Sequence, residues 1–387
     1  MSDQPSDTND QHVGDQHVGD QHVGDQHVGI DDEALGPAAE LLHAVSEAPS
    51  DSAPPLLEVS GLRTWFHTRS GDIRAVDGVD LTVGRGEILG LVGESGSGKS
   101  VTMLSVLRLI DKPGRIVDGT VLFDGTDLAT LDRRKLRDVR GNRISMVFQQ
   151  PNASLHPCYT AGVQISEVYE IHRNSTRKAG VEKAVEMLRK VGIPDPGRRA
   201  RSYPHQLSGG QAQRVMIAMA LAAEPELLIA DEPTTALDVT IQAQILDLMR
   251  ELQADSGTSV VLITHDLGVV AEMAHRVAVM YGGQIVEQAP VEALFADPRH
   301  PYTRGLLGSV PVIGVRQDSL TVIKGRVPTL IDPEPGCRFA DRCPERMEVC
   351  SLATPALVDT GDGRQVRCFL HSDATVEETA VTIGARR

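Results

Sequence analysis

The sequence predicts an α/β fold built on a parallel sheet. Short apolar runs typical of buried strands recur along the chain, and segments with helical periodicity separate the later ones. In addition, a glycine-rich turn lies directly between one such run, Ile88 to Val92, and a helical pattern from Val101 to Ile110. Strands that alternate with helices pair in parallel and carry the helices on their faces. We therefore expect an α/β core with parallel strands.

The first 55 residues are predicted to be a disordered acidic tail. They contain twelve Asp and Glu but no Lys or Arg, and residues 10–29 are four identical copies of Asp-Gln-His-Val-Gly. Low hydrophobicity, regular glycine and one-sided charge predict disorder. The four histidines of the repeat could bind a transition metal, but the composition favours a solvated tail. Residues 38–48 have the pattern of a short helix, and residues 50–55 are expected to be a linker.

From Leu56 the pattern is that of a folded domain, which we assign to residues 56–290. The expected strands are residues 56–59, 81–83, 88–92, 120–123, 144–148, 227–230 and 260–264. Residues 158–201 have helical periodicity without a strand candidate, and residues 276–288 are expected to form a hairpin that turns at Gly282-Gly283. Beyond Pro290 the chain is richer in Pro and Cys, so residues 291–387 are expected to form a C-terminal extension.

Composition and charge exclude several classes of protein. The formal net charge is −15, but outside the acidic tail the remaining 41 acidic residues nearly balance 38 Lys and Arg. A near-neutral body argues against nucleic acid as a partner. No run reaches eighteen consecutive apolar residues, so no membrane-spanning helix is expected. The N-terminus lacks the basic-then-apolar order of a secretion signal, so we expect a cytosolic chain whose five cysteines form no disulfides.

The glycine-rich turn has the spacing of a phosphate-binding loop, G-x-x-x-x-G-K-[ST]. Its glycines let the backbone curl so that several N–H groups point at phosphate oxygens, and the following helix adds the positive end of its dipole. Lys99 is expected to reach the β- and γ-phosphates, and Ser100 is expected to hold Mg²⁺. The residues expected to bind a nucleoside triphosphate are Gly93, Glu94, Ser95, Gly96, Ser97, Gly98, Lys99 and Ser100.

A second motif, Leu207-Ser208-Gly209-Gly210-Gln211, precedes a helical run from Ala212 to Ala223. After that run come four apolar residues and the pair Asp231-Glu232. This order of motifs resembles the ATP-binding subunits of ABC transporters, and the likeness covers nearly all of residues 56–288. The resemblance implies a P-loop ABC ATPase core in which a helical subdomain, about residues 158–222, carries the signature motif.

The resemblance also gives roles to polar residues at the ends of the core strands. Glu232 is the candidate general base, and Asp231 orients Mg²⁺ and its water. Two adjacent carboxylates at a strand end would repel each other unless a cation lay there, which agrees with Mg²⁺. Gln149 is expected at the Mg²⁺ and the attacking water, at a hinge toward the transporter, and His265 is expected to contact the γ-phosphate. Phe66 takes the position of the ring that stacks on adenine.

The assignment of the adenine-stacking ring leaves an alternative, and the role of the signature motif requires a second subunit. Trp65 is the stacking residue if the register is shifted by one position. Two small residues that open a helix leave N–H groups which can approach phosphate closely, and in this family they contact ATP bound to a second ATPase subunit, a different chain or a second copy. The residues expected to face the neighbouring subunit are Ser208, Gly209, Gly210, Gln211 and Asp238.

Two further segments indicate the transported solute. Residues 151–157 resemble the segment of peptide-permease ATPases that receives the coupling helices of membrane subunits, and residues 300–307 match a C-terminal marker of the oligopeptide/dipeptide/nickel branch. The resemblance implies an ATP-hydrolysing motor for import of di- and oligopeptides, peripheral at the cytoplasmic face of the membrane. Its implied partners are two membrane permease subunits and, indirectly, an extracytoplasmic solute-binding protein.

Other functions remain open at this point. Nickel or another small solute of the same branch is one alternative to peptides. A soluble ABC ATPase of translation or DNA repair is another, although such proteins carry two nucleotide-binding domains or a long coiled-coil insertion, and neither is visible in this sequence.

The extension contains four cysteines in the spacing C-x5-C-x6-C-x17-C, without a C-x2-C pair. Four thiolates suit a [4Fe–4S] cluster or zinc. The resemblance implies the cluster, which would be structural or a redox-gated regulator; zinc and four separate thiols are the alternatives. Because these residues lie outside the nucleotide motifs in the sequence, we expect loss of a cluster to leave ATP affinity unchanged. The set is Cys337, Cys343, Cys350 and Cys368, and Cys158 is expected to be an unrelated thiol.

Overall fold

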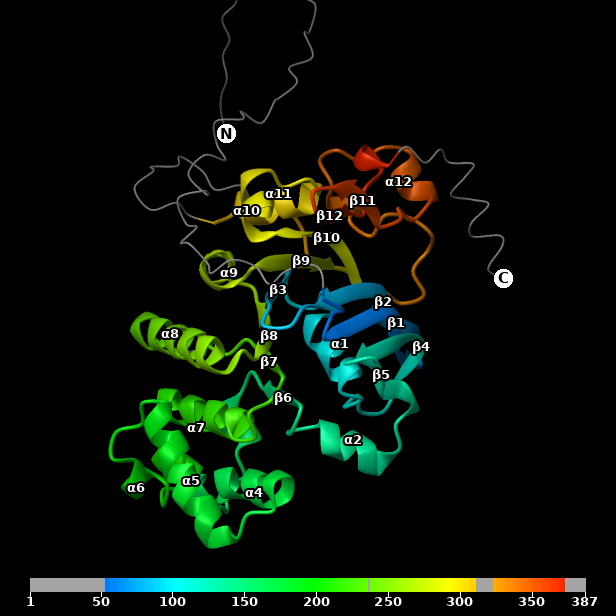
Figure 1. Cartoon of the computed structure of the whole chain (residues 1–387). Helices are drawn as coiled ribbons and strands as arrows, with labels where there is room; N and C mark the ends of the chain where they lie inside the picture. Colours follow the sequence, from blue (N-terminus) through cyan, green and yellow to red (C-terminus); the bar gives the residue numbers. More distant parts are fainter. Residues whose placement is uncertain (1–52, 236, 311–322, 373–387) are drawn as a thin grey trace, which may run out of the picture. The chain divides into compact units, whose positions relative to one another are not determined.

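We describe the chain from a computed structural model, which covers residues 53–235, 237–310 and 323–372 (Figure 1). The expected repeat tail and the short helix at 38–48 lie outside the described residues. The described part contains an eight-stranded sheet and a four-stranded sheet, with helices between the strands. The predicted mixed α/β fold is therefore confirmed.

The larger sheet has a parallel centre. Its strand order is β11-β12-β10-β9-β3-β8-β7-β6, and β9, β3, β8, β7 and β6 pair in parallel. Every residue of β3, β7 and β8 is buried, which explains their continuous apolar sequences. The carboxyl ends of parallel strands meet at one edge of a sheet, so residues that follow them are brought together. The bounds of these strands are β3 Ile88–Val92, β6 Ile144–Val147, β7 Leu227–Asp231, β8 Ser259–Thr264 and β9 Arg276–Tyr281.

Three of the expected strands belong instead to a separate antiparallel sheet with the order β2-β1-β4-β5. The sequence analysis predicted these three strands but did not predict how they pair. The short link between β1 and β2 allows only a hairpin, since a parallel pair needs a crossover of a dozen residues or more. These strands are also longer than expected, because half-exposed polar residues interrupt their apolar runs. They are β1 Leu57–Thr68, β2 Gly71–Val83, β4 Gly114–Phe123 and β5 Thr126–Asp127.

Helices follow most of the parallel strands. The helix α1 (Lys99–Val106) follows β3, and α9 (Leu267–Met273) follows β8. Between β6 and β7 the chain forms α3 and then α4, α5, α6 and α7, which pack on one another and are drawn in green in Figure 1. Their bounds are α4 Ala161–Arg173, α5 Arg177–Lys190, α6 Pro196–Arg199 and α7 Gly209–Leu221. The other α-helices are α2 Arg133–Val139, α3 Pro151–Ser154, α8 Val239–Ser256, α10 Val291–Ala296, α11 Pro301–Leu307 and α12 Val349–Leu352.

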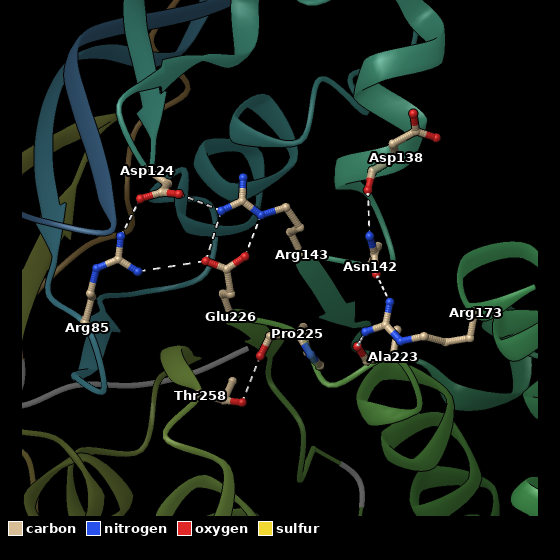
Figure 2. Close-up of polar contacts among 10 residues, drawn as sticks. All are labelled: Arg85, Asp124, Asp138, Asn142, Arg143, Arg173, Ala223, Pro225, Glu226 and Thr258. Carbon is tan, nitrogen blue, oxygen red and sulfur yellow. Dashed lines mark hydrogen bonds and ion pairs between the residues drawn. The ribbon is translucent and has the colours of Figure 1, made fainter.

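A polar network holds the amino ends of β6 and β7 together (Figure 2). Arg143, just before β6, donates to both carboxylate oxygens of Glu226, just before β7, at 2.5 and 3.0 Å, and to Asp124 at 2.8 Å. Arg173, at the end of α4, donates to the side chain of Asn142 at 2.6 Å and to the carbonyl oxygen of Ala223. The network therefore connects α4 and the end of α7 to the amino ends of β6 and β7. The phosphate-binding motif lies at the opposite, carboxyl ends of the parallel strands.

The C-terminal extension continues the main sheet. The strand β10 (Gln284–Pro290) pairs with β9 and with β12 (Arg364–Val366), which in turn pairs with β11 (Val358–Gly361). The expected hairpin is confirmed, and its turn uses two glycines with positive φ, Gly282 at 52° and Gly283 at 78°. None of the described helices is long and apolar enough to cross a bilayer.

Candidate nucleotide-binding site

The phosphate-binding motif lies at the carboxyl edge of the parallel strands, where it joins β3 to α1. Its backbone requires glycine at defined positions. Gly93, Gly96 and Gly98 have φ values of 149°, 82° and 106°. A Cβ on Gly93 would lie 2.2 Å from the carbonyl oxygen of Met280, and one on Gly98 would lie 2.3 Å from that of Ala75. Larger residues would therefore displace the loop, as expected for a backbone cradle.

Lys99 is the buried cation of this loop. It is 5% exposed, and its Nζ donates to the carbonyl oxygens of Gly93 at 2.7 Å and Glu94 at 3.0 Å. Burial lowers the pKa of Lys99, and the carboxylates of Glu232, Asp231 and Glu94 oppose that shift. No side chain caps the start of α1. The free N-terminal turn and the buried ammonium group together favour a bound anion.

The residues expected to hold Mg²⁺ at this loop lie in contact with each other. Ser100, in the first turn of α1, donates its hydroxyl to Oδ1 of Asp231 at 2.9 Å. Asp231 is the last residue of β7, and its burial raises the pKa of its carboxyl group. A hydroxyl and a carboxylate at the mouth of the loop are hard oxygen ligands, the kind that Mg²⁺ prefers.

Glu232 is held at the end of β7 by three side chains. Gln149 donates to its Oε2 at 2.6 Å, Thr235 donates to the same oxygen at 2.8 Å, and Nδ1 of His265 lies 3.3 Å from Oε1. Its backbone has a φ of 45°, a left-handed conformation that is uncommon outside glycine, and its N–H donates to Ile263 at 2.9 Å.

These contacts keep Glu232 ionised. Desolvation alone would raise the pKa of Glu232, but the hydrogen bonds from Thr235, Gln149 and His265 outweigh it, so the pKa is lowered. The hydrogen bond from Thr235 to Glu232 was not predicted from the sequence. The signal that could have found it is its spacing, since a hydroxyl three residues after a turn residue can bond back to it.

The signature motif lies at the start of α7. Ser208 caps this helix by accepting from the N–H of Gln211 at 3.4 Å, and Gln211 accepts from the N–H of Ser208 at 3.3 Å. This reciprocal capping box orders the motif. Ser208 and Gly209 are exposed. Within the described residues, no hydrogen bond joins the motif or Asp238, the N-cap of α8, to the phosphate loop of the same chain.

The two candidate stacking rings lie on neighbouring positions of β1. Trp65 has the guanidinium of Arg74 over its ring, 4.7 Å from the ring centroid. Phe66 is half-buried and pairs with Ile73 on β2 and Gly114 on β4. The two rings are therefore neighbours on β1, and Arg74 covers one face of Trp65.

The C-terminal extension contacts the phosphate loop, which the sequence did not indicate. Arg342 donates to both carboxylate oxygens of Glu94 at 2.6 and 2.9 Å, and the N–H of Glu94 donates to the phenol oxygen of Tyr302 at 2.9 Å. The four cysteines lie outside the nucleotide motifs in the sequence, but Arg342 and Tyr302 bring the extension into contact with the phosphate loop. The β9–β10 hairpin could be predicted from the sequence, but no local sequence pattern shows that the residues after it return to the phosphate loop.

The four cysteines of the extension are free thiols near one another. Burial raises the pKa of Cys337 and of Cys343 to about 11, and the charges of Cys350 and Cys368 add to both shifts. However, no group of three or more His, Cys, Asp or Glu among the described residues is arranged to hold a metal ion. The structure thus gives no support to the expected [4Fe–4S] cluster or to zinc.

Comparisons with known proteins agree with the geometry. A family described as "ABC transporter" matches residues 76–235, and one described as "Oligopeptide/dipeptide transporter, C-terminal region" matches residues 286–350. The oligopeptide transport ATP-binding protein AppD of Bacillus subtilis is 51% identical over 325 residues, which cover 84% of this chain and 99% of AppD. The dipeptide transport ATP-binding protein DppD of Escherichia coli is 48% identical, over 82% of this chain and 97% of DppD.

Solved structures of ABC cassettes have the same core. The dimeric structure of MJ0796, a bacterial ABC transporter cassette, is 30% identical with a TM-score of 0.56, and the match covers 61% of this chain and 98% of the cassette. A dimeric MJ0796 in a post-hydrolysis state with ADP and Pi matches with a TM-score of 0.55. By its sequence motifs, its fold and these relatives, the chain belongs to the ABC transporter ATPases, in the oligopeptide/dipeptide branch.

Proposed function

We propose that the chain is the ATP-hydrolysing subunit of an importer for di- and oligopeptides. The main observation is that Lys99, Asp231, Glu232 and Gln149 lie together at one edge of the sheet. The relatives of the chain are peptide transport ATP-binding proteins. The nickel importer and the soluble ABC ATPase are less well supported, since AppD and DppD are named for peptides.

In the proposed mechanism, Gly93 to Ser100 bind the triphosphate, and Ser100, Asp231 and Gln149 would hold Mg²⁺. The metal, when bound, would supply charge neutralisation at the phosphates. Glu232 accepts the proton of the attacking water, and its lowered pKa keeps it in the basic form at neutral pH. Gln149 and Thr235 fix the orientation of this carboxylate, and His265 contacts the γ-phosphate. Phe66 stacks on the adenine ring.

A second ATPase subunit completes the site in this proposal. Ser208, Gly209, Gly210 and Gln211 are ordered at the helix start and do not reach their own phosphate loop, so they are available to a neighbouring chain. MJ0796, a structural neighbour, is described as a dimer. Asp238 supports the opposite subunit in the same interface. The partner is a second copy or a related ATPase.

We place the contact with the membrane subunits beside Gln149. A cavity of about 230 Å³ opens there, lined largely by apolar side chains that include Leu109, Phe148, Leu155 and Met219. Phe148 precedes Gln149 and is 38% exposed. A short amphipathic helix of a permease subunit fits such a groove, and its movement would be transmitted through Gln149 to Glu232. In this proposal the chain is peripheral at the cytoplasmic face, and the solute-binding protein lies on the far side of the membrane.

Uptake in cells tests the proposed solute class. In a strain that lacks this chain and is auxotrophic for one amino acid, growth on a dipeptide containing that amino acid should be lost and growth on the free amino acid kept. Wild-type chain should restore growth on the dipeptide, whereas Glu232→Gln should not. A strain that keeps dipeptide growth but loses nickel-dependent enzyme activity would show that the solute is the metal ion instead.

We also propose the four cysteines as a ligand set, with a [4Fe–4S] cluster preferred over zinc. Cys337 and Cys350 are neighbours, since the N–H of Cys337 donates to the carbonyl oxygen of Cys350 at 2.8 Å, and Cys337 and Cys343 pack against the same hydrophobic cluster. To bind a metal, the four thiol side chains would have to reorient, because the described residues contain no metal-holding group. The thiols would also have to lose their protons, and metal binding favours this loss.

Anaerobic purification should give a brown protein with about four irons per chain, as four thiolates around a [4Fe–4S] centre require. Replacing Cys343 and Cys350 by Ser should remove the colour, while Cys158→Ser should keep it. One zinc per colourless chain would select the zinc alternative. Four titratable thiols without metal after anaerobic reconstitution would exclude a ligand set.

A further inference from the structure

Glu94, the second residue of the phosphate loop, is held by the C-terminal extension. Arg342 lies 248 residues further along the chain, yet two of its nitrogens donate to the two oxygens of Glu94, at 2.6 and 2.9 Å. The side chain of Arg342 is 7% exposed and that of Glu94 is 28% exposed. A bidentate pair with this degree of burial has a defined geometry and is stronger than an exposed ion pair.

Arg342 is itself fixed by the extension. It ends a 3-10 helix, Ala340–Arg342, and its Nε donates to the carbonyl oxygen of Lys324 at 2.9 Å. Its guanidinium also lies 5.7 Å from the ring centroid of Tyr281, whose hydroxyl accepts from Nη1 at 3.4 Å. Because these contacts come from β9 and from the extension, the guanidinium cannot follow Glu94 if the loop changes shape.

The backbone of Glu94 is held at two more points. Its N–H donates to the hydroxyl of Tyr302 at 2.9 Å, and its carbonyl oxygen accepts from Lys99 at 3.0 Å. Tyr302 is fully buried in α11, and its ring packs against Tyr281 and Phe339 with centroids 4.7 and 5.3 Å apart. The direction of this peptide group is therefore set by an aromatic cluster to which the extension contributes Tyr302 and Phe339.

We propose that Arg342 and Tyr302 are positioning residues that hold the phosphate loop in its ATP-binding shape. A glycine-rich loop loses much conformational entropy when it closes around phosphate, and a loop already held in that shape loses less. The extension would thus raise ATP affinity without touching the nucleotide. The inference rests on the proposed nucleotide site, and it extends that site to a region beyond the ATPase motifs.

The same contacts connect the cysteines structurally to the nucleotide site. Cys337 and Cys343 flank the 3-10 helix that ends in Arg342, and the N–H of Cys337 donates to the carbonyl oxygen of Cys350 at 2.8 Å. A change in the fold of residues 337–350 would move Arg342 and release Glu94. In this proposal, a loss of structure around the cysteines would lower ATP affinity, whereas the sequence analysis expected loss of a cluster to leave ATP affinity unchanged.

Equilibrium binding of a fluorescent ATP analogue with Mg²⁺, in the full chain, tests the proposal. Arg342→Gln should raise the Kd about tenfold, as expected for loss of a charge-assisted pair. Arg342→Lys should fall between wild type and Arg342→Gln, because an ammonium group keeps the charge but not the bidentate geometry. Turnover at saturating ATP should stay close to wild type, since Glu232 and Gln149 are untouched.

Two further variants separate positioning from misfolding. Tyr302→Phe removes only the hydroxyl that accepts from Glu94, and it should raise the Kd a few-fold. Arg346→Gln is the matched control: Arg346 lies on the same extension and pairs with Asp341 at 3.1 Å and Ser351 at 2.8 Å, away from the loop. It should bind the analogue as wild type does.

A double-variant cycle identifies the partner of Arg342. If Arg342 acts through Glu94, then Glu94→Gln combined with Arg342→Gln should bind no more weakly than Arg342→Gln alone. An unchanged Kd in both Arg342→Gln and Tyr302→Phe, with binding lost in Lys99→Ala, would overturn the inference and leave the proposed site intact. Normal binding in Lys99→Ala would instead overturn the site itself.

Discussion

Replacing Glu232 by Gln is expected to lower ATP turnover by about 10²- to 10⁴-fold, the usual contribution of a general base, while ATP binding is retained. The side-chain amide has nearly the shape of the carboxylate, so Gln149 and Thr235 can still donate to its oxygen. It cannot accept a proton from water, however. Steady-state phosphate release and binding of a fluorescent ATP analogue measure the two effects separately.

The same variant should accumulate an ATP-bound dimer, because hydrolysis is the step that lets the subunits separate in the proposed mechanism. Gel filtration with Mg²⁺ and ATP detects it. Adding Ser208→Arg to Glu232→Gln should abolish the dimer and leave nucleotide binding by the single chain unchanged, since Ser208 is exposed and does not contact its own phosphate loop. Phosphate release near the wild-type rate in Glu232→Gln would remove Glu232 from the role of base.

Lys99→Ala is expected to weaken ATP binding by about 10- to 100-fold, as loss of hydrogen bonds from a charged donor predicts. The substitution removes the buried cation and leaves Asp231 and Glu232 without the nearby charge of Lys99 that offsets their repulsion of phosphate. Isothermal titration with Mg²⁺ and ATP measures the affinity. Hydrolysis at low ATP should fall in parallel.

Lys190→Ala is the matched control for Lys99→Ala, because Lys190 is an exposed lysine at the end of α5, outside every site described. It should bind ATP as wild type does. Equal affinities for ATP in the two variants would contradict the assignment of the phosphate loop.

Local sequence determines the parts of the site that depend on neighbouring residues. The glycines at 93, 96 and 98 have the positive φ values of a tight loop, and they lie between β3 and α1 as their order in the chain requires. Ser208 and Gln211 are spaced to cap each other at the start of α7. The buried strands β3, β7 and β8 could be predicted because their apolar runs are continuous.

Only the tertiary structure determines which distant residues meet. Gln149 and Glu232 are 83 residues apart and touch because β6 and β7 are neighbours in the sheet, so their carboxyl ends are adjacent. The sequence could not show that β1, β2 and β4 form a separate antiparallel sheet, since apolar runs do not specify a pairing partner.

The contact of Arg342 with Glu94 is the feature that the sequence was least able to predict. It depends on the β9–β10 hairpin, on the aromatic cluster of Tyr281, Tyr302 and Phe339, and on the 3-10 helix of the extension. No sequence pattern around an arginine in a Cys- and Pro-rich segment identifies the acidic residue with which it pairs. A side chain's chemistry can be inferred from the sequence, but the partner of a long-range ion pair is decided by the path of the folded chain.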